Sequence, residues 1–402
     1  MRRAPALSFL LITVFLDLLS LGLIVPIVPA LLTTVTGDAA DAVRWSGLLG
    51  STFGLLQFVV APLLGQLSDR YGRRPVLLTS LACLGVDWLA HAISPDPWTL
   101  LAFHALAGAC AGTNTVVNAY VADIIEPRGR ARAYGLIGAA FSCGFVAGPT
   151  IGGLLGAMDV RLPFFAAAAL CFANVAYGWF VLPESRPGDR TTPLTLRTAN
   201  PIGALTAVLR RPTLGRLAHA RLYSDIARMT HQSTWAFYLT TQFTWSTAHI
   251  GLVMAGAALA GALFQATAVA PIIHRLGVKR AAVLGATLTV ATLTGTAFAN
   301  APWQLYAVQT VAVLSSFGPA AAQSWISTTA TPTEQGTVQG ALTAISATAE
   351  TLVPITAAAA FAWSLTHATP GLPFAVAAAF TATSALLLSK TDRPRPHPTR
   401  PN

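Results

Sequence analysis

Long apolar stretches, separated by short polar gaps, follow one another along almost the whole chain. Each stretch is close to the roughly 20 residues that a helix needs to cross the hydrocarbon core of a bilayer, which gives about 12 candidate spans. The spans cover residues 7–34, 45–67, 76–94, 98–122, 133–156, 162–182, 214–241, 247–272, 281–300, 303–328, 336–362 and 371–389. This pattern predicts an all-α membrane protein with about 12 transmembrane helices.

The two halves of the chain repeat each other. One constant offset brings glycines, prolines and other residues of the first half onto identical residues of the second half. The matched pairs are Arg70 and Arg275, Gly72 and Gly277, Pro97 and Pro302, Trp98 and Trp303, Gly135 and Gly340, and Pro149 and Pro354. Two six-helix repeats in parallel orientation are typical of secondary transporters, which bind substrate between the halves near the middle of the bilayer. We therefore predict an N-terminal bundle over residues 1–182 and a C-terminal bundle over residues 214–389.

Polar segments lie between the two bundles and at the end of the chain. Residues 183–213 are rich in Pro, Thr and Arg, which predicts a linker. Residues 390–402 hold too many prolines to pack, which predicts a disordered tail. Most Lys and Arg residues lie in alternate gaps, so the positive-inside rule puts the linker, the tail and both termini in the cytoplasm.

The composition supports a membrane protein and excludes other classes. Of the 402 residues, 54% are hydrophobic and only 10% are charged, against about 25% charged in soluble domains. So little charge excludes a soluble enzyme and a disordered protein. The formal net charge is +10, but most of the basic residues lie in alternate gaps between the spans, as the positive-inside rule requires. The charge therefore reports the topology, and we expect no nucleic-acid partner. The four cysteines lie in different spans without metal-ligand spacing, so we expect no metal site and no disulfide.

The loop after the second span carries a dense charged motif. Its residues are Gly65, Asp69, Arg70, Gly72, Arg73 and Arg74. Asp69 lies at a helix end beside three arginines, so charge-assisted pairs can hold neighbouring helices together in one conformation. The glycines permit a tight turn. This loop resembles the signature loop of the major facilitator superfamily, and the resemblance implies that it is a conformational latch.

The fifth span contains Gly144, Gly148, Pro149, Gly152 and Gly153. Each glycine lowers helix propensity, but small residues let another helix approach closely, and proline allows a bend. The pattern resembles the motif of the drug:proton antiporters within the same superfamily. The resemblance implies export of the substrate.

The first half is more narrowly similar to the tetracycline/proton antiporters. The similarity covers residues 10–185 well. It covers the second half thinly, chiefly at Phe264 and Gln265, at the loop around Gly277, and at Gln335, Gly336, Gln339 and Gly340. It implies export of an amphipathic small molecule against an inward flow of protons.

Some positions match these antiporters and others depart from them. The family has acidic residues in helices one and three, which Asp17 and Asp87 match. It has an arginine in helix four, where this chain has His104. It also has a histidine in helix eight and an aspartate in helix nine, where we place Gly261 and Thr289. These departures put transport of tetracycline itself in doubt.

Ionisable groups inside the predicted spans are the main functional candidates. Inserting such a group into the middle of a bilayer costs roughly 2.5–3.5 kcal/mol of free energy, so each one is a candidate for a functional role. For proton coupling we select the carboxylic acids Asp17, Glu350, Asp225 and Asp87. For substrate binding we select Arg228, Asp225, His231, Gln232, His104, Gln265 and Trp235.

The seventh span, residues 214–241, is unusually polar, and only the internal repeat and the even number of spans predict a membrane helix there. Arg221, Asp225, Arg228 and Gln232 follow helical spacing and share one face, which cannot meet lipid. Two interpretations stay open. Asp225 and Arg228 contact substrate or exchange partners during a proton cycle, or the three charged residues form a closed cluster that only holds the helix in register. If Arg221 neutralises Asp225, Arg228 is left for Glu350 or for an anionic group of the substrate.

Three functions are compatible with these observations. The first is proton-coupled efflux of an antibiotic or secondary metabolite by alternating access. The second is proton-coupled uptake of a metabolite. The third is a membrane enzyme or receptor on a transporter scaffold, but no catalytic triad, metal spacing or nucleotide loop supports it, so we expect no enzyme. We expect a monomer in the bacterial inner membrane, with a small molecule, protons and lipid as partners and with no cofactor.

Overall fold

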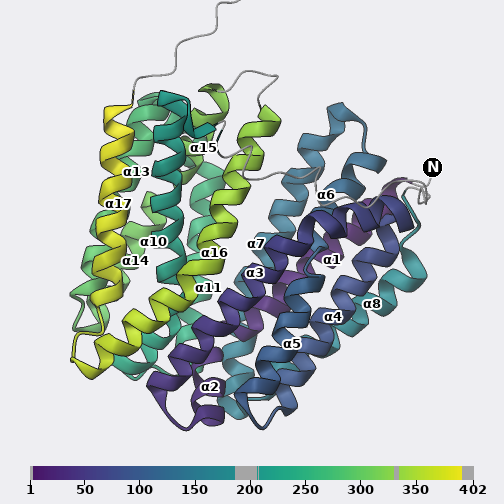
Figure 1. The fold of residues 1–402 in the computed structure, drawn as a ribbon, viewed down its shortest axis with the longest axis horizontal. Helices are drawn as coiled ribbons and strands as arrows, with labels where there is room; N and C mark the ends of the chain where they lie inside the picture. Colours follow the sequence, from purple (N-terminus) through teal and green to yellow (C-terminus); the bar gives the residue numbers. More distant parts are fainter. Residues whose placement is uncertain (1–2, 186–205, 207, 330–334, 392–402) are drawn as a thin grey trace, which may run out of the picture. The chain divides into compact units, whose positions relative to one another are not determined.

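The computed structural model describes residues 3–185, 206, 208–329 and 335–391, and these residues form helices without any strand (Figure 1). The all-α fold predicted from the sequence is confirmed. The helices are α1 (Arg3–Ile24), α2 (Val28–Thr36), α3 (Ala39–Tyr71), α4 (Arg73–Ile93), α5 (Pro97–Cys110), α6 (Thr113–Ile124), α7 (Pro127–Met158), α8 (Leu162–Val181), α10 (Pro212–Phe243), α11 (Thr247–Thr267), α12 (Val269–Leu276), α13 (Val278–Ala297), α14 (Pro302–Ser315), α15 (Phe317–Thr329), α16 (Gln335–Thr366) and α17 (Leu372–Lys390). Most of the predicted linker 183–213 and nearly all of the predicted tail 390–402 lie outside the described residues.

Most of the helices meet the requirements of a membrane span. Among the described residues, 9 helices are long and apolar enough to cross a bilayer, or up to 11 when two bent pairs each count as one span. The polar helix α10 is not among them, because Arg221, Asp225 and Arg228 lower its hydropathy. The internal repeat, rather than hydropathy, predicted a span there.

Several predicted spans are broken into two helices, which the sequence analysis treated as one. The span at 7–34 is α1 and α2, the span at 247–272 is α11 and α12, and the span at 303–328 is α14 and α15. Proline explains the last two of these breaks, since its ring collides with the carbonyl group four residues earlier. Helix α11 ends at Thr267, four residues before Pro271, and α14 ends at Ser315, four residues before Pro319.

The span at 98–122 is also broken, into α5 and α6, but without a proline. Ala111 leaves the helical conformation with ψ of 71°, and the buried Gly112 follows it. A Cβ on Gly112 would lie 3.0 Å from a methyl group of Leu64 on α3. The break therefore brings the chain close to a neighbouring helix.

The chain divides into two compact units. The first comprises Met1–Ala199, Ser233–Leu259 and Pro354–Trp363, and the second comprises Asn200–Gln232, Ala260–Val353 and Ser364–Asn402. The divisions fall inside α10, α11 and α16, so each of these helices contributes to both units.

The first unit is built around α1, which packs against α7 and α8, while α4 packs against α5 and α8. The contact with α1 is made by one face of α7, here called the glycine face, which consists of Gly144, Gly148 and Gly152. A Cβ on Gly148 would lie 2.6 Å from the Cα atom of Gly22, and a Cβ on Gly152 would overlap the carbonyl oxygen of Leu23. The two backbones therefore touch directly.

The other side of the same motif contacts α11. A Cβ on Gly153 would lie 2.6 Å from the carbonyl oxygen of Thr247, and a Cβ on Gly251 would overlap the carbonyl oxygen of Pro149. Helix α7 is thus packed closely on two sides, and the motif provides the small residues that both contacts require.

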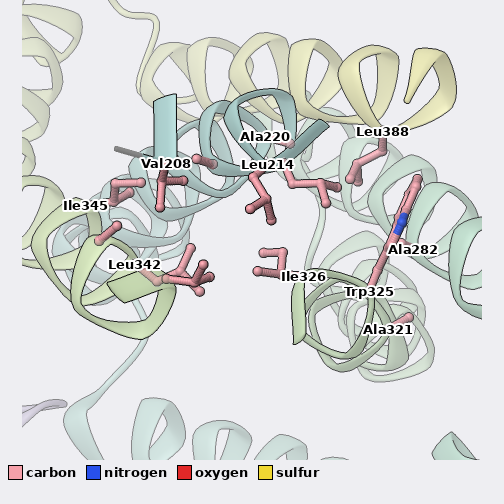
Figure 2. Packing of buried hydrophobic residues seen from close by; sticks show 14 of the residues in the cluster. Val208, Leu214, Ala220, Ala282, Ala321, Trp325, Ile326, Leu342, Ile345 and Leu388 are labelled. Carbon is pink, nitrogen blue, oxygen red and sulfur yellow. The ribbon is translucent and has the colours of Figure 1, made fainter. Parts of the chain in front are cut away.

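The second unit is centred on α13, which contacts α14, α15 and α17 (Figure 1). Its core includes the fully buried Trp325 together with aliphatic residues of α10, α15 and α16. Figure 2 shows Leu214 of α10, Ile326 of α15 and Leu342 of α16 facing a shared interior. These helices also carry the charged side chains described next.

Candidate functional site

Four charged side chains of the second unit alternate in sign, and we call Arg221, Asp225, Arg228 and Glu350 the charge row. The Nε atom of Arg221 lies 2.7 Å from Oδ2 of Asp225. The Nε atom of Arg228 lies 3.4 Å from Oδ1 of the same carboxylate, and its Nη2 atom lies 3.6 Å from Oε1 of Glu350. The distances increase along the row, so the pair of Arg228 and Glu350 is the loosest.

Burial also changes along the charge row. Asp225 is nearly inaccessible, with 4% of its side chain exposed, whereas Arg228 and Glu350 are 47% and 42% exposed. Pairing two cations with the buried acid compensates the cost of removing its charge from water. The exposed end of the row remains accessible to a ligand.

Polar side chains from two further helices complete the buried end of the charge row. The hydroxyl group of Ser346 on α16 donates a hydrogen bond of 2.8 Å to Asp225. Arg221 donates to Ser346 at 3.1 Å and to the amide oxygen of Gln323 on α15 at 3.4 Å. These contacts hold α10, α15 and α16 together around one carboxylate.

A cavity of about 340 Å³ lies beside the charge row and is lined by residues of the second unit. Helices α10, α13, α14, α15 and α17 surround it. Arg221, Asp225 and Arg228 are its charged lining residues, and most of the other lining side chains are small or apolar. Pockets of this kind, apolar with a few converging polar groups, suit amphipathic small molecules.

The other substrate-binding candidates of the second unit occupy different positions. His231 lines the cavity, and its ring meets Phe374 edge to face at 5.8 Å. Gln232 and Gln265 are exposed and are not among the lining residues. Thr289, which stands where the resembled family has an acid, lines the cavity and donates its hydroxyl hydrogen to a backbone oxygen at 3.0 Å.

Four candidates belong to the first unit. Trp235 is buried and stacks on Tyr238, with ring centroids 6.3 Å apart. Asp17 lies on α1, and its Oδ1 atom is buried without a hydrogen-bond partner among the described residues. Asp87 and His104 form a pair, with 2.8 Å between Oδ2 and Nδ1.

Asp87 and His104 belong to helices that are joined by a short turn, since α4 ends at Ile93 and α5 begins at Pro97. Asp96 caps the start of α5. Hydrogen bonds from the Thr99 hydroxyl and from backbone N–H groups lower the pKa of Asp96. The cap therefore holds its negative charge at the positive end of the helix dipole.

The charged loop between α3 and α4 is organised by Arg73, whose side chain is only 8% exposed. Its guanidinium group pairs with Asp69 at 2.6 Å and with Asp123 of α6 at 3.1 Å, and it donates to the hydroxyl of Ser68 at 2.5 Å. The carboxylate of Glu184 accepts the backbone N–H of Arg73 at 2.7 Å. The loop thus connects α3, α4 and α6 with the end of α8.

The remaining loop residues have distinct positions. Gly72 has a φ angle of +101°, which favours glycine, and a Cβ there would collide with Glu184. Arg74 donates to the carbonyl oxygen of Trp179 and lies over its ring. Arg70 lies 5.6 Å from the ring centroid of Tyr71, while a Cβ on Gly65 would have an ordinary contact of 4.0 Å with a methyl group of Thr115.

Replacing Arg73 with lysine is expected to destabilise the protein by roughly 1–3 kcal/mol, because a single ammonium group cannot bridge Asp69, Asp123 and Ser68 with the geometry of a guanidinium. Thermal unfolding of the purified chain in detergent measures the change. The control is Arg44→Lys, since Arg44 pairs with Asp41 at the surface with both side chains more than half exposed. Equal unfolding temperatures for the two variants would contradict the bridging role of Arg73.

The sequence analysis missed several residues that contact the charge row or the charged loop around Arg73. Ser346 and Gln323 contact Asp225 or Arg221 from more than 90 positions away, and no local pattern indicates such contacts. The contacts of Asp123 and Glu184 with the charged loop could have been predicted from the sequence. Both are acids at the ends of predicted spans, on the side where the basic loop lies, so charge complementarity could have suggested them.

Comparisons with known proteins agree with this architecture. Residues 10–224 and 217–402 each match the family described as Major Facilitator Superfamily. The class C tetracycline resistance protein of Escherichia coli is 35% identical over 346 residues, which are 86% of this chain and 87% of that protein. The class G tetracycline resistance protein of Vibrio anguillarum is 33% identical over 344 residues, with 86% of this chain and 87% of that protein covered.

Solved structures show the same fold at lower sequence identity. The nucleoside transporter NupG superposes with a TM-score of 0.78 at 13% identity, covering 96% of this chain and 98% of that one. The human organic anion transporter MFSD10 superposes with a TM-score of 0.69 at 24% identity, covering 96% of this chain and 99% of that one. The family match in both halves, the curated relatives and the helical fold lead to one conclusion: this chain is a multi-pass membrane transporter and belongs to the Major Facilitator Superfamily.

Proposed function

We propose that this chain exports an amphipathic small molecule, of the antibiotic or secondary-metabolite class, in exchange for protons. The charge row beside an apolar cavity is the observation that carries the proposal. The tetracycline resistance proteins, at 35% and 33% identity over most of the chain, support drug efflux. The site of action is the bacterial cytoplasmic membrane, and the chain acts as a monomer.

Substrate recognition is assigned to the exposed end of the charge row. Arg228 and Glu350 are 3.6 Å apart and almost half exposed, so little interaction energy is lost when a ligand separates them. A substrate with a polar or ionised edge can then pair with either group, while its apolar body occupies the cavity. Asp225 keeps its contact with Arg221 throughout, because that pair is shorter and more buried.

Proton coupling is assigned first to Asp17. The Oδ1 atom of Asp17 is buried without a hydrogen-bond partner among the described residues, and a charge on such an oxygen is costly, so Asp17 is expected to carry a proton when it is closed off from water and to release it when water enters. Alternating access provides these two conditions in turn. Asp87, Asp225 and Glu350 all have cationic or histidine partners, which makes them weaker candidates for this role.

Export of a drug is tested by expressing the chain in a pump-deficient bacterium and measuring growth inhibition by tetracyclines, phenicols, macrolides, quinolones and cationic dyes. We expect protection against one class, lost in the Asp17→Asn variant and retained in Asp41→Asn, which changes an exposed acid that pairs with Arg44. In everted vesicles with an acidic interior, the protective compound should release protons only when Asp17 is intact.

Two outcomes would overturn parts of this proposal. Equal protection by the Asp17→Asn variant would remove Asp17 from the proton pathway. Greater accumulation of a compound in expressing cells than in control cells would indicate uptake instead of export.

A further inference from the structure

Three potential metal ligands gather between α4 and α5 in the first unit. Asp87 and His91 lie one turn apart on α4, and His104 lies on α5. The Nδ1 atom of His91 is 3.2 Å from Oδ1 of Asp87, and the Nδ1 atom of His104 is 2.8 Å from Oδ2. One potential ligand atom of each side chain lies within 4.8 Å of the others.

The cluster is buried, yet one of its oxygen atoms is unsatisfied. Asp87 is fully buried and His91 is 5% exposed, while the His104 side chain retains 17% exposure. Oδ1 of Asp87 accepts no well-formed hydrogen bond from the described residues, because the Nδ1 atom of His91, 3.2 Å from it, lies closer to the backbone oxygen of Asp87, at 2.9 Å. A buried carboxylate oxygen in this state has capacity for another ligand.

Aromatic rings surround the cluster. The ring of His91 stacks on Phe164 with centroids 5.7 Å apart and meets Trp88 edge to face at 5.6 Å. The ring of His104 lies 5.0 Å from that of Phe53. This apolar shell strengthens electrostatic interactions within it and leaves access on the side of His104.

We propose that Asp87, His91 and His104 bind one divalent transition-metal ion of the Zn²⁺ class. Bonds of about 2.0–2.2 Å hold the ligand atoms of such an ion roughly 3–4 Å apart, so small side-chain rotations suffice. Two imidazoles and one carboxylate favour Zn²⁺, Co²⁺ or Ni²⁺ over Mg²⁺, which prefers oxygen ligands. Three protein ligands leave a coordination position for water. The bound ion connects α4 to α5.

The proposal is tested on the full chain, purified in detergent through a tag without histidines and stripped with a chelator. ZnCl2, NiCl2 and MgCl2 are titrated separately by calorimetry. We expect one equivalent of Zn²⁺ or Ni²⁺ to bind and Mg²⁺ not to bind. His104→Gln should weaken Zn²⁺ binding by about tenfold or more, and the control His274→Gln, at an exposed position of α12, should not.

A second measurement separates lost binding from lost folding. Zn²⁺ should raise the thermal unfolding temperature of the unchanged chain and of His274→Gln, but not that of His91→Gln or His104→Gln. Zn²⁺ binding that is equal in all variants, or absent from the stripped chain, would overturn the site and leave a histidine–aspartate hydrogen-bond cluster. Both readouts are independent of transport, so they are interpretable whether or not export is observed.

Discussion

The variant Asp225→Asn is expected to be less stable to unfolding than the unchanged chain by roughly 2–3 kcal/mol. Removing one partner from a buried ion pair costs roughly 3–5 kcal/mol, and the partial exposure of both arginines reduces this to roughly 2–3 kcal/mol. A difference of 1.4 kcal/mol is tenfold in an equilibrium, so the ratio of folded to unfolded chain should fall about 30-fold or more. Thermal unfolding in detergent measures the stability, and the initial rate in everted vesicles, at equal content of folded chain, measures export.

Two further variants decide between the interpretations of the seventh span. The double variant Arg221→Gln/Asp225→Asn removes both charges of the tightest pair, so it should recover most of the lost thermal stability. If Asp225 takes part in the transport cycle, export stays low in the double variant. Export at the original rate would show that the cluster only holds α10 in register. Asp41→Asn, at an exposed pair, should change export by less than twofold.

The variant Gly152→Ala is expected to destabilise the first unit by about 3 kcal/mol or more. Its Cβ would overlap the carbonyl oxygen of Leu23, and backbone cannot rotate away as a side chain can. Overpacking of a core costs roughly 1–3 kcal/mol when side chains can adjust. A collision with the backbone is expected to cost about 3 kcal/mol or more, because the backbone adjusts less. Thermal unfolding in detergent and the yield of folded chain measure the effect.

The matched control lies on the same helix. A Cβ on Gly138 meets nothing within 4 Å, so Gly138→Ala should stabilise α7 by up to about 1 kcal/mol through helix propensity. The two substitutions are chemically identical and should differ in sign. Similar unfolding temperatures would show that α1 can move away from α7 at little cost and that the glycine face is not a tight contact.

The sequence predicted the helices well because a bilayer imposes a simple rule on their length and hydropathy. It missed the breaks after Ile24, Cys110, Thr267 and Ser315, since a hydropathy window averages over the few residues that a break involves. Pro271 and Pro319 mark two of these breaks and could have been used. The polar helix α10 required the internal repeat, because its charges conceal the apolar pattern.

The candidate site was only partly predictable. Helical spacing placed Arg221, Asp225 and Arg228 on one face, and the structure brings all three to the cavity. The contacts of Ser346 and Gln323 depend on how distant helices pack, which spacing does not report. In the same way, Asp87 and His91 are one turn apart in the sequence, whereas the position of His104 beside them follows from the α4–α5 turn.

The direct contact of the α1 and α7 backbones also constrains how this transporter can evolve. Every single-base change that turns a glycine codon into the codon of another amino acid introduces a Cβ atom. No such change at Gly148 or Gly152 would therefore preserve the backbone contact. The cavity is different, because it is lined largely by Ala, Ser and Thr, which interconvert by single-base changes and differ little in volume. New substrate ranges are therefore expected to arise by drift of the cavity lining, while the glycine face stays unchanged between lineages.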